Sequence, residues 1–124
     1  MNIAFDWGRC LEINESVRQL AREAFAAGHG VFVVPALGFA DFPYEQTLAS
    51  LNVPVTAIHR VRLEPPFPEA VAVAKVCMMK KLGCVVLYDD LASNVEVAMA
   101  AGIEGVLVRE GEDVSRPSWL AEGK

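Results

Sequence analysis

The chain has 124 residues, which is typical of one domain, and 53% of them are hydrophobic, which excludes a disordered chain. A net charge of −5 without a basic stripe argues against nucleic-acid binding. No apolar run reaches the ~20 residues that span a bilayer, and the first residues do not resemble a signal peptide, so we expect a cytoplasmic protein with no membrane partner.

The first half of the chain predicts three strands and two helices. Residues 2–6 form a short apolar run that ends in Asp6, and residues 30–34 form another. Apolar residues at helical spacing lie between these runs, with Asn14 as a possible cap and Gly28 as the stop. A short helix is expected at residues 44–51. A third strand at residues 53–58 contains Pro54, which places it at an edge of the sheet.

The second half predicts two helices and two strands. Pro68 suits the first turn of a helix that runs to about Leu82. The strongest strand signal, residues 84–88, runs directly into Asp89-Asp90. The pattern Ser93-x-x-Glu96 predicts a capping box for the next helix, which Gly102 would end, and residues 105–108 predict a fifth strand.

Strands that alternate with helices predict a parallel α/β sheet covered on both faces. We expect one three-layer α/β/α domain of Rossmann-like type, with about five strands, over residues 1–110. Residues 111–124 are a polar C-terminal tail that the pattern does not place. The strand order 5-4-1-2-3 is expected because it makes the strands that precede Asp6 and Asp89 neighbours. Every connection is short, which leaves no room for an inserted lid.

Acidic residues follow two of these strands where ligands of α/β sheets usually bind, at the carboxyl ends. If Asp6, Asp89 and Asp90 converge there, their charges repel unless a cation or a proton intervenes. Mg²⁺ is the common cation for a site of oxygen ligands. The alternative is that these acids only cap the helices that follow.

Lys75 is a lone cation within nine apolar neighbours, residues 70–79. On a helix packed beneath the same edge of the sheet, its ammonium could reach the carboxylates or a bound phosphate. The alternative is a lysine that extends to solvent from a partly exposed helix.

These segments resemble motifs of the haloacid dehalogenase superfamily in their order and spacing, over about residues 2–108. Residues 3–11 are similar to its first motif, an apolar strand followed by Asp-x-Asp-Gly-Thr-Leu. Residues 86–94, with the glycines and strand after them, are similar to its fourth motif. Lys75 stands at the position of the third-motif lysine, and residues 33–37 stand where the second motif offers Ser or Thr.

The resemblance implies a phosphoryl-transfer site. Asp6 would be the nucleophile and would form an aspartyl-phosphate. Asp6, Asp89 and the backbone carbonyl of Gly8 would hold Mg²⁺, with Asp90 beside them. Lys75 would neutralise the nucleophile and the phosphoryl oxygens.

Four positions depart from the family pattern. Gly8 replaces the second Asp, the general acid that protonates the leaving group, and Pro35 or Ala36 replaces the phosphate-binding hydroxyl. Arg9 and Cys10 replace the Gly and Thr of the first motif. Some members without the second Asp still react, including phosphonoacetaldehyde hydrolases, but these also use a cap domain.

The resemblance leaves two hypotheses. The first is a capless, Mg²⁺-dependent phosphohydrolase-type enzyme with weakened or unusual activity on a phosphorylated small molecule. The second is a catalytically inactive module that binds a macromolecular partner. A receiver domain is disfavoured because its acid pair follows the first strand. A nucleophilic Cys10 is disfavoured because neither His29 nor His59 is placed beside it, and the odd count of three cysteines indicates reduced thiols.

Overall fold

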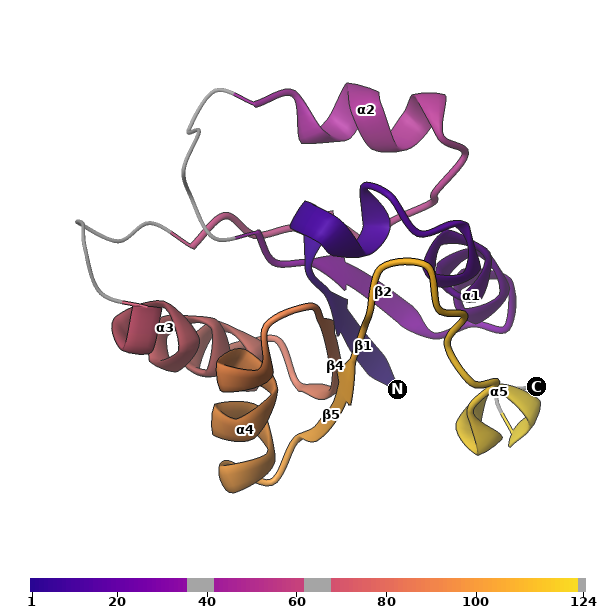
Figure 1. The fold of residues 1–124 in the computed structure, drawn as a ribbon. Coiled ribbons are helices and arrows are strands. Elements are labelled where there is room, and N and C mark those ends of the chain that lie inside the picture. The colour runs from indigo at the N-terminus through magenta and orange to yellow at the C-terminus, as the bar shows by residue number, and fades with distance from the viewer. Residues whose placement is uncertain (36–41, 62–67, 123–124) are drawn as a thin grey trace.

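The computed structural model describes residues 1–35, 42–61 and 68–122 (Figure 1). A turn at Trp7–Leu11 follows the first strand. The strands are β1 (Asn2–Phe5), β2 (Gly30–Val33), β3 (Ala57–Ile58), β4 (Cys84–Asp89) and β5 (Glu104–Leu107). The helices are α1 (Glu15–Ala26), α2 (Tyr44–Ser50), α3 (Pro68–Lys81), α4 (Ala92–Ala100) and α5 (Ser118–Glu122).

All five strands are parallel, which confirms the expected fold class. They lie in the order β3-β2-β1-β4-β5, which is 5-4-1-2-3 when counted from the β5 edge. The first strand is therefore central, and Phe5 pairs with Val33 on one side and Tyr88 on the other. Asp6 consequently follows the strand next to the one that ends in Asp89.

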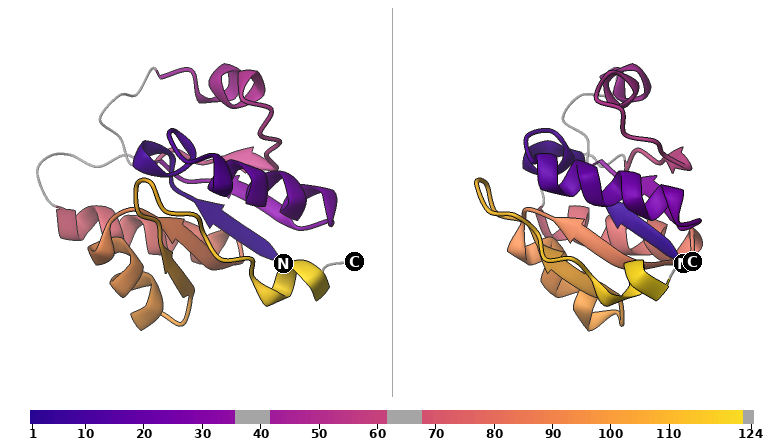
Figure 2. Two further views of the ribbon diagram at one scale, coloured as in Figure 1. Left: turned by 45° about the vertical axis from the view of Figure 1, so that its right-hand side comes forward. Right: turned by 90° about the vertical axis from the view of Figure 1, so that its right-hand side faces the viewer.

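Two hydrophobic clusters cover the two faces of the sheet. Alternate strand residues such as Ile3 and Phe5 pack with Val17 and Leu20 of α1, while Ala4 packs in the cluster of α3 and α4. Figure 2 shows α1 on one side of the sheet and α3 and α4 on the other. β1 and β2 are buried on both faces beyond their first residues, whereas Val85 of β4 is exposed and β5 is only partly buried.

The ends of α1 confirm the sequence signals, whereas the start of α4 does not. Asn14 caps α1 by accepting a hydrogen bond from the Ser16 backbone N–H at 3.2 Å, and Gly28 follows its end with φ of 92°. The capping box at Ser93 is wrong. α4 begins earlier, at Ala92, and the carbonyl of its N-cap residue Leu91 accepts from Val95.

The third strand is an edge strand, as predicted, but it is much shorter than residues 53–58. The strand itself covers Ala57 and Ile58, and the backbone N–H groups of Thr56 and His59 donate to β2 on either side of it. Pro54 has no N–H to donate to a ladder, so pairing begins only beyond it. Thr56 still reaches β2, where its hydroxyl accepts from the Val31 N–H at 3.0 Å.

The C-terminal segment, which the sequence did not place, packs along α1. The Val114 N–H donates to the Ser16 hydroxyl at 3.1 Å, and Arg116 pairs with Glu23 at 2.8 Å. Trp119 and Leu120 are buried in the same cluster as α1. None of the helices within the described residues has both the length and the apolar character to cross a membrane.

Arg9 occupies a left-handed backbone conformation, with φ of 55°, at the position where the first motif has Gly. This conformation costs a residue with a Cβ roughly 1–2 kcal/mol relative to glycine. We expect Arg9→Gly to be about 1 kcal/mol more stable than Arg9→Ala, because both lose the same exposed ion pair and only Gly relieves the backbone. Urea denaturation of the two variants tests this. Equal midpoints would show that the turn can relax around a side chain.

Candidate functional site

Lys75 lies between the carboxylates of two neighbouring strands. Its ammonium donates to Asp6 Oδ1 at 2.8 Å and to Asp89 Oδ2 at 3.0 Å. Lys75 is 1% exposed, Asp6 7% and Asp89 0%, so the contacts are almost free of solvent. The structure therefore brings together the lysine of α3 and the two acids as the sequence predicted, and it excludes a solvent-facing Lys75.

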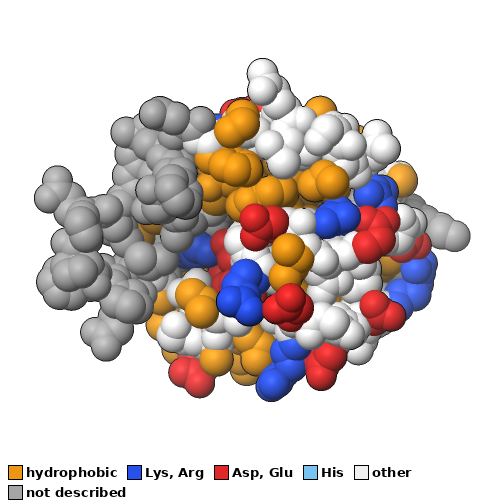
Figure 3. Space-filling view, turned by 45° about the horizontal axis from the view of Figure 1, so that its top comes forward, with side chains coloured by type: hydrophobic (Ala, Val, Ile, Leu, Met, Phe, Trp, Pro, Cys, Tyr) orange, Lys and Arg blue, Asp and Glu red, His pale blue; other side chains and the backbone are white. Residues whose placement is uncertain are grey.

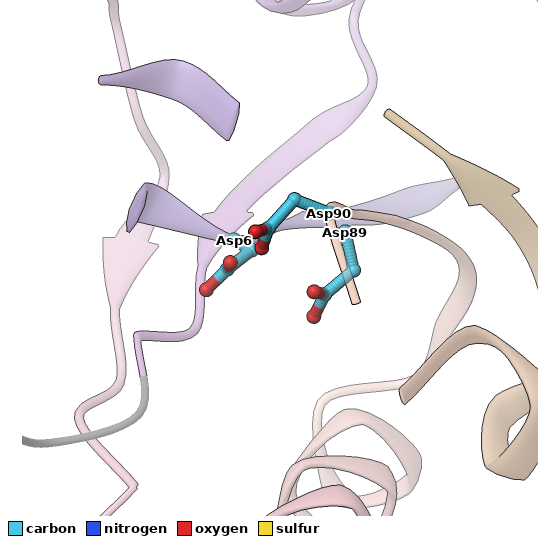
Figure 4. A group of neighbouring side chains, drawn as sticks. All are labelled: Asp6, Asp89 and Asp90. Carbon is cyan, nitrogen blue, oxygen red and sulfur yellow. The ribbon is translucent and has the colours of Figure 1, made fainter. Parts of the chain in front are cut away.

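Asp90 completes a cluster of three carboxylates. Asp6, Asp89 and Asp90 each offer an oxygen within 4.8 Å of the others, and Figure 4 shows all three side chains at the same edge of the sheet. Two oxygens bound to one Mg²⁺ at ~2.1 Å lie at most ~4.2 Å apart, so a small contraction suffices for a shared ion.

Asn94 supports this cluster from the first turn of α4. Its side-chain N–H donates to Asp89 Oδ2 at 3.1 Å, and the Leu91 N–H donates to Asp89 Oδ1 at 3.0 Å. Asn94 Oδ1 is buried and has no partner among the described residues. No separate role was predicted for Asn94 from the sequence, although its spacing of five residues from Asp89 is the signal that places it there.

The charges of the cluster do not balance. Three carboxylates face one ammonium, which raises the pKa of Asp6 to about 7, because burial and then the negative charge of Asp89 outweigh the attraction of Lys75. Burial opposes the charge of Lys75, but Asp6 and Asp89 outweigh it and raise the pKa of the ammonium. A site that is short of positive charge, with hard oxygen donors and an unpartnered amide oxygen, fits a divalent cation.

No protein-family model matches the chain, and no curated protein matches it significantly. A solved structure of an uncharacterised protein from Corynebacterium glutamicum is similar in fold. It has a TM-score of 0.62 and 22% identity, and the match covers 88% of this chain and 85% of that one. At this identity the likeness supports the fold alone.

Gly8 lies in the turn after β1, two residues beyond Asp6. Its backbone has φ of −62° and ψ of 127°, which any residue can adopt, and a Cβ placed on it would meet nothing within 4 Å. An aspartate would therefore fit at this position. The lack of an acid at this position is not imposed by space or by backbone geometry.

The second-motif position offers no side-chain donor in the described residues. Pro35 is buried, and its carbonyl accepts a hydrogen bond from the Val61 N–H at 3.0 Å. The backbone at this position is therefore used in pairing with the segment at Val61. Ala36, the other residue predicted at this position, lies outside the described residues.

Cys10 is fully buried, and its thiol lies 3.6 Å from the Tyr88 carbonyl. Burial and the negative charge of Asp6 raise its pKa well above the usual value. The thiol therefore stays protonated, which disfavours a nucleophilic role.

An aromatic cluster, Trp7, Phe42 and Tyr44, flanks the turn that carries Gly8. The ring centre of Trp7 lies 5.7 Å from that of Phe42 and 6.0 Å from that of Tyr44. The Arg60 guanidinium carbon lies 5.1 Å from the ring centre of Tyr44. Local sequence patterns do not reveal this cluster, because its contacts join segments that are far apart in the chain. It fixes the position of the residue directly after Asp6.

The pKa of Asp6 predicts how stability depends on pH in metal-free protein. The folded state holds the Asp6 proton up to about pH 7, whereas a free aspartate loses it near 3.8. Asp6 therefore contributes stability at low pH that is lost as the pH rises through 7. In chelator, we expect wild type to lose up to a few kcal/mol between pH 4.5 and 7.5 relative to Asp6→Asn.

Urea denaturation of the two proteins at both pH values measures this difference. Added Mg²⁺ should reduce the loss in wild type and leave Asp6→Asn nearly unchanged. Parallel pH profiles in chelator would show that Asp6 titrates normally in the folded protein.

Proposed function

We propose that this protein is a Mg²⁺-dependent phosphohydrolase-type enzyme similar to the haloacid dehalogenase superfamily, with Asp6 as its nucleophile and with weakened activity. The observation that carries the proposal is the buried Lys75 ammonium, which bridges Asp6 and Asp89. An enzyme of this type needs its nucleophile and metal carboxylate side by side with a cation between them. The cytoplasm suits it, because Cys10, Cys77 and Cys84 are all free thiols.

Asp6 would attack the phosphorus of a phosphorylated small molecule. The new bond is from an Asp6 oxygen to phosphorus, and the bond that breaks releases the alcohol oxygen with its electron pair. Water then attacks the aspartyl-phosphate, which restores the Asp6 carboxylate and releases phosphate. Lys75 favours the ionised form of Asp6, as a bound Mg²⁺ would, and it offsets the charge on the phosphoryl oxygens.

Asp6, Asp89, Asp90 and the Gly8 carbonyl are the groups that would hold Mg²⁺. When bound, the ion would supply positive charge against the phosphoryl oxygens. Asn94 would keep Asp89 oriented through its 3.1 Å hydrogen bond. Such supporting contacts typically matter 10–100-fold for metal affinity or activity (~1–3 kcal/mol).

The activity should be weak because the chain has no side chain to protonate the leaving group and none at the second-motif position to bind phosphate. Gly8 cannot protonate a departing alkoxide, and Pro35 cannot donate a hydrogen bond to phosphate. Substrates with good leaving groups need the proton least. We therefore expect p-nitrophenyl phosphate to react faster than an alkyl phosphate, each with a high KM.

The same two absences support a second candidate, a catalytically inactive module that binds a macromolecular partner through this edge of the sheet. The two candidates differ in one measurable property: only an enzyme needs Asp6 to accept a phosphoryl group.

Beryllium fluoride, which mimics a phosphoryl group on aspartate, separates the candidates. We expect ¹⁹F NMR of the wild type with Mg²⁺ to show bound fluoride, and the signal to be lost in Asp6→Asn and on removal of Mg²⁺. Glu112→Gln is the matched control, because Glu112 is an exposed acid of the C-terminal segment. This variant should retain the fluoride signal. No bound fluoride in the wild type, together with no turnover of p-nitrophenyl phosphate, would favour the binding module.

A further inference from the structure

A pocket of about 440 Å³ lies beside the carboxylate cluster, between the loops that follow β1, β4 and β5. Asp90 belongs to both the cluster and the pocket wall, so a ligand in the pocket would adjoin the site described above. The remaining lining residues are Arg9, Leu91, Ala92, Leu107, Val108, Arg109 and Glu110.

Two arginines from distant parts of the chain converge on this pocket. Arg9 comes from the turn after β1, and Arg109 follows β5. Arg9 pairs with Glu110 at 3.1 Å and Arg109 with Glu112 at 3.9 Å, and all four side chains are about two-thirds exposed. Exposed pairs of this kind contribute little to stability, so either guanidinium can exchange its glutamate for an incoming anion.

The start of α4 adds one further donor to the pocket. Ala92 lines the pocket and begins α4, where no side chain caps the helix, and its N–H has no acceptor among the described residues. On the face seen in Figure 3, basic and acidic side chains alternate rather than form a patch of one sign. Two arginines and two acids, Asp90 and Glu110, line the pocket, so a preference for an anion depends on the arginines exchanging their glutamate partners for the ligand.

We infer that this pocket binds a second anionic group of the substrate, so that the preferred substrates are small phosphorylated acids rather than phosphorylated neutral alcohols. The inference rests on the proposed function for the position of the phosphoryl group at Asp6. Arg9 and Arg109 would hold the second anion at the far end, with the apolar side chains of Leu107 and Val108 against the carbon skeleton.

A matched pair of compounds tests the inference. 3-Phosphoglycerate and glycerol 3-phosphate share the same phosphate ester and differ in a carboxylate at the other end. Calorimetric titration into wild-type protein with Mg²⁺ gives both Kd values. We expect 3-phosphoglycerate to bind about tenfold more tightly, which is the scale of one charge-assisted hydrogen bond.

The variants assign the preference to the pocket. The quantity compared is the Kd of glycerol 3-phosphate divided by the Kd of 3-phosphoglycerate. Arg9→Gln and Arg109→Gln should each reduce this Kd ratio towards one. Glu110→Gln should increase it, because this change removes the carboxylate that competes for Arg9. Arg116→Gln is the matched control, because Arg116 is similarly exposed and pairs with Glu23 on α1, away from the pocket. It should leave the ratio unchanged.

Hydrolysis followed in the same samples separates the two proposals. A Kd ratio near one in the wild type, or a ratio that neither pocket arginine changes, overturns this inference even if both compounds are hydrolysed. A ratio that depends on the arginines without any hydrolysis supports this inference and contradicts the proposed function.

Discussion

Replacing Gly8 by aspartate should raise the turnover of alkyl phosphates by about 10²-fold, which is the lower range for a general acid. The new carboxyl group would stand two residues after Asp6, where the resembling family has its proton donor. The structure allows the change, because a Cβ on Gly8 meets nothing within 4 Å and its φ is −62°. The gain should be smaller for p-nitrophenyl phosphate, whose leaving group needs no proton.

Gly8→Asn is the matched control, since it adds the same volume without a transferable proton. Steady-state turnover of both variants and of Gly8→Asp combined with Asp6→Asn, all with Mg²⁺, completes the test. The double variant should be inactive. Equal rates for Gly8→Asp and Gly8→Asn would contradict the proposed role, and so would activity that survives the loss of Asp6. A fourth carboxylate also adds repulsion in the metal-free site, so the stability of Gly8→Asp should depend more strongly on Mg²⁺ than that of the control.

Replacing Lys75 by methionine should destabilise metal-free protein by about 3–5 kcal/mol near pH 7.5, the usual cost of removing one partner from a buried ion pair. Methionine has a similar length, so packing changes little, but Asp6 and Asp89 would lose their shared cation. The cost should be smaller at pH 5, where the carboxylates can take up protons instead. Urea denaturation in chelator at both pH values measures it.

Lys80→Met is the matched control, because Lys80 lies on the same helix and is exposed. It should change stability by less than about 0.5 kcal/mol. Mg²⁺ should restore part of the stability of Lys75→Met, since the ion can replace the missing charge. A loss for Lys75→Met no larger than that for Lys80→Met would show that the buried pairs contribute nothing to stability.

The core of the site could be predicted from the sequence because it follows from two local signals. Acids directly after buried strands must lie at the carboxyl edge of a parallel sheet, and this rule predicts Asp6 and Asp89 as site residues. A lone lysine in an apolar helix must pair with a buried partner or extend to solvent, and this rule predicts Lys75. The strand order then follows if the strands that precede Asp6 and Asp89 are neighbours.

Other features depend on contacts that local patterns do not contain. The pattern at Ser93 suggested a cap, but the start of α4 is set by Asp89, which accepts the Leu91 N–H. The C-terminal segment is held by a few isolated polar contacts and by the buried side chains of Trp119 and Leu120. Two buried residues are too few to give a periodic hydrophobic pattern in the sequence. The pairing of Arg9 with Glu110 joins residues 101 positions apart, so the pocket between them was not visible in the sequence.

The central position of β1 has a consequence for synthesis on the ribosome. β1 is made before the other strands, yet one of its two neighbours, β4, is complete only at residue 89. Until then the nascent chain can form only the β3-β2-β1 part of the sheet, which leaves one edge of β1 open and Asp6 without Asp89 beside it. Open edges of this kind promote association between chains. A pause in translation before β4 has left the ribosome should therefore increase aggregation of newly made chains, and a pause after β4 has left it should not.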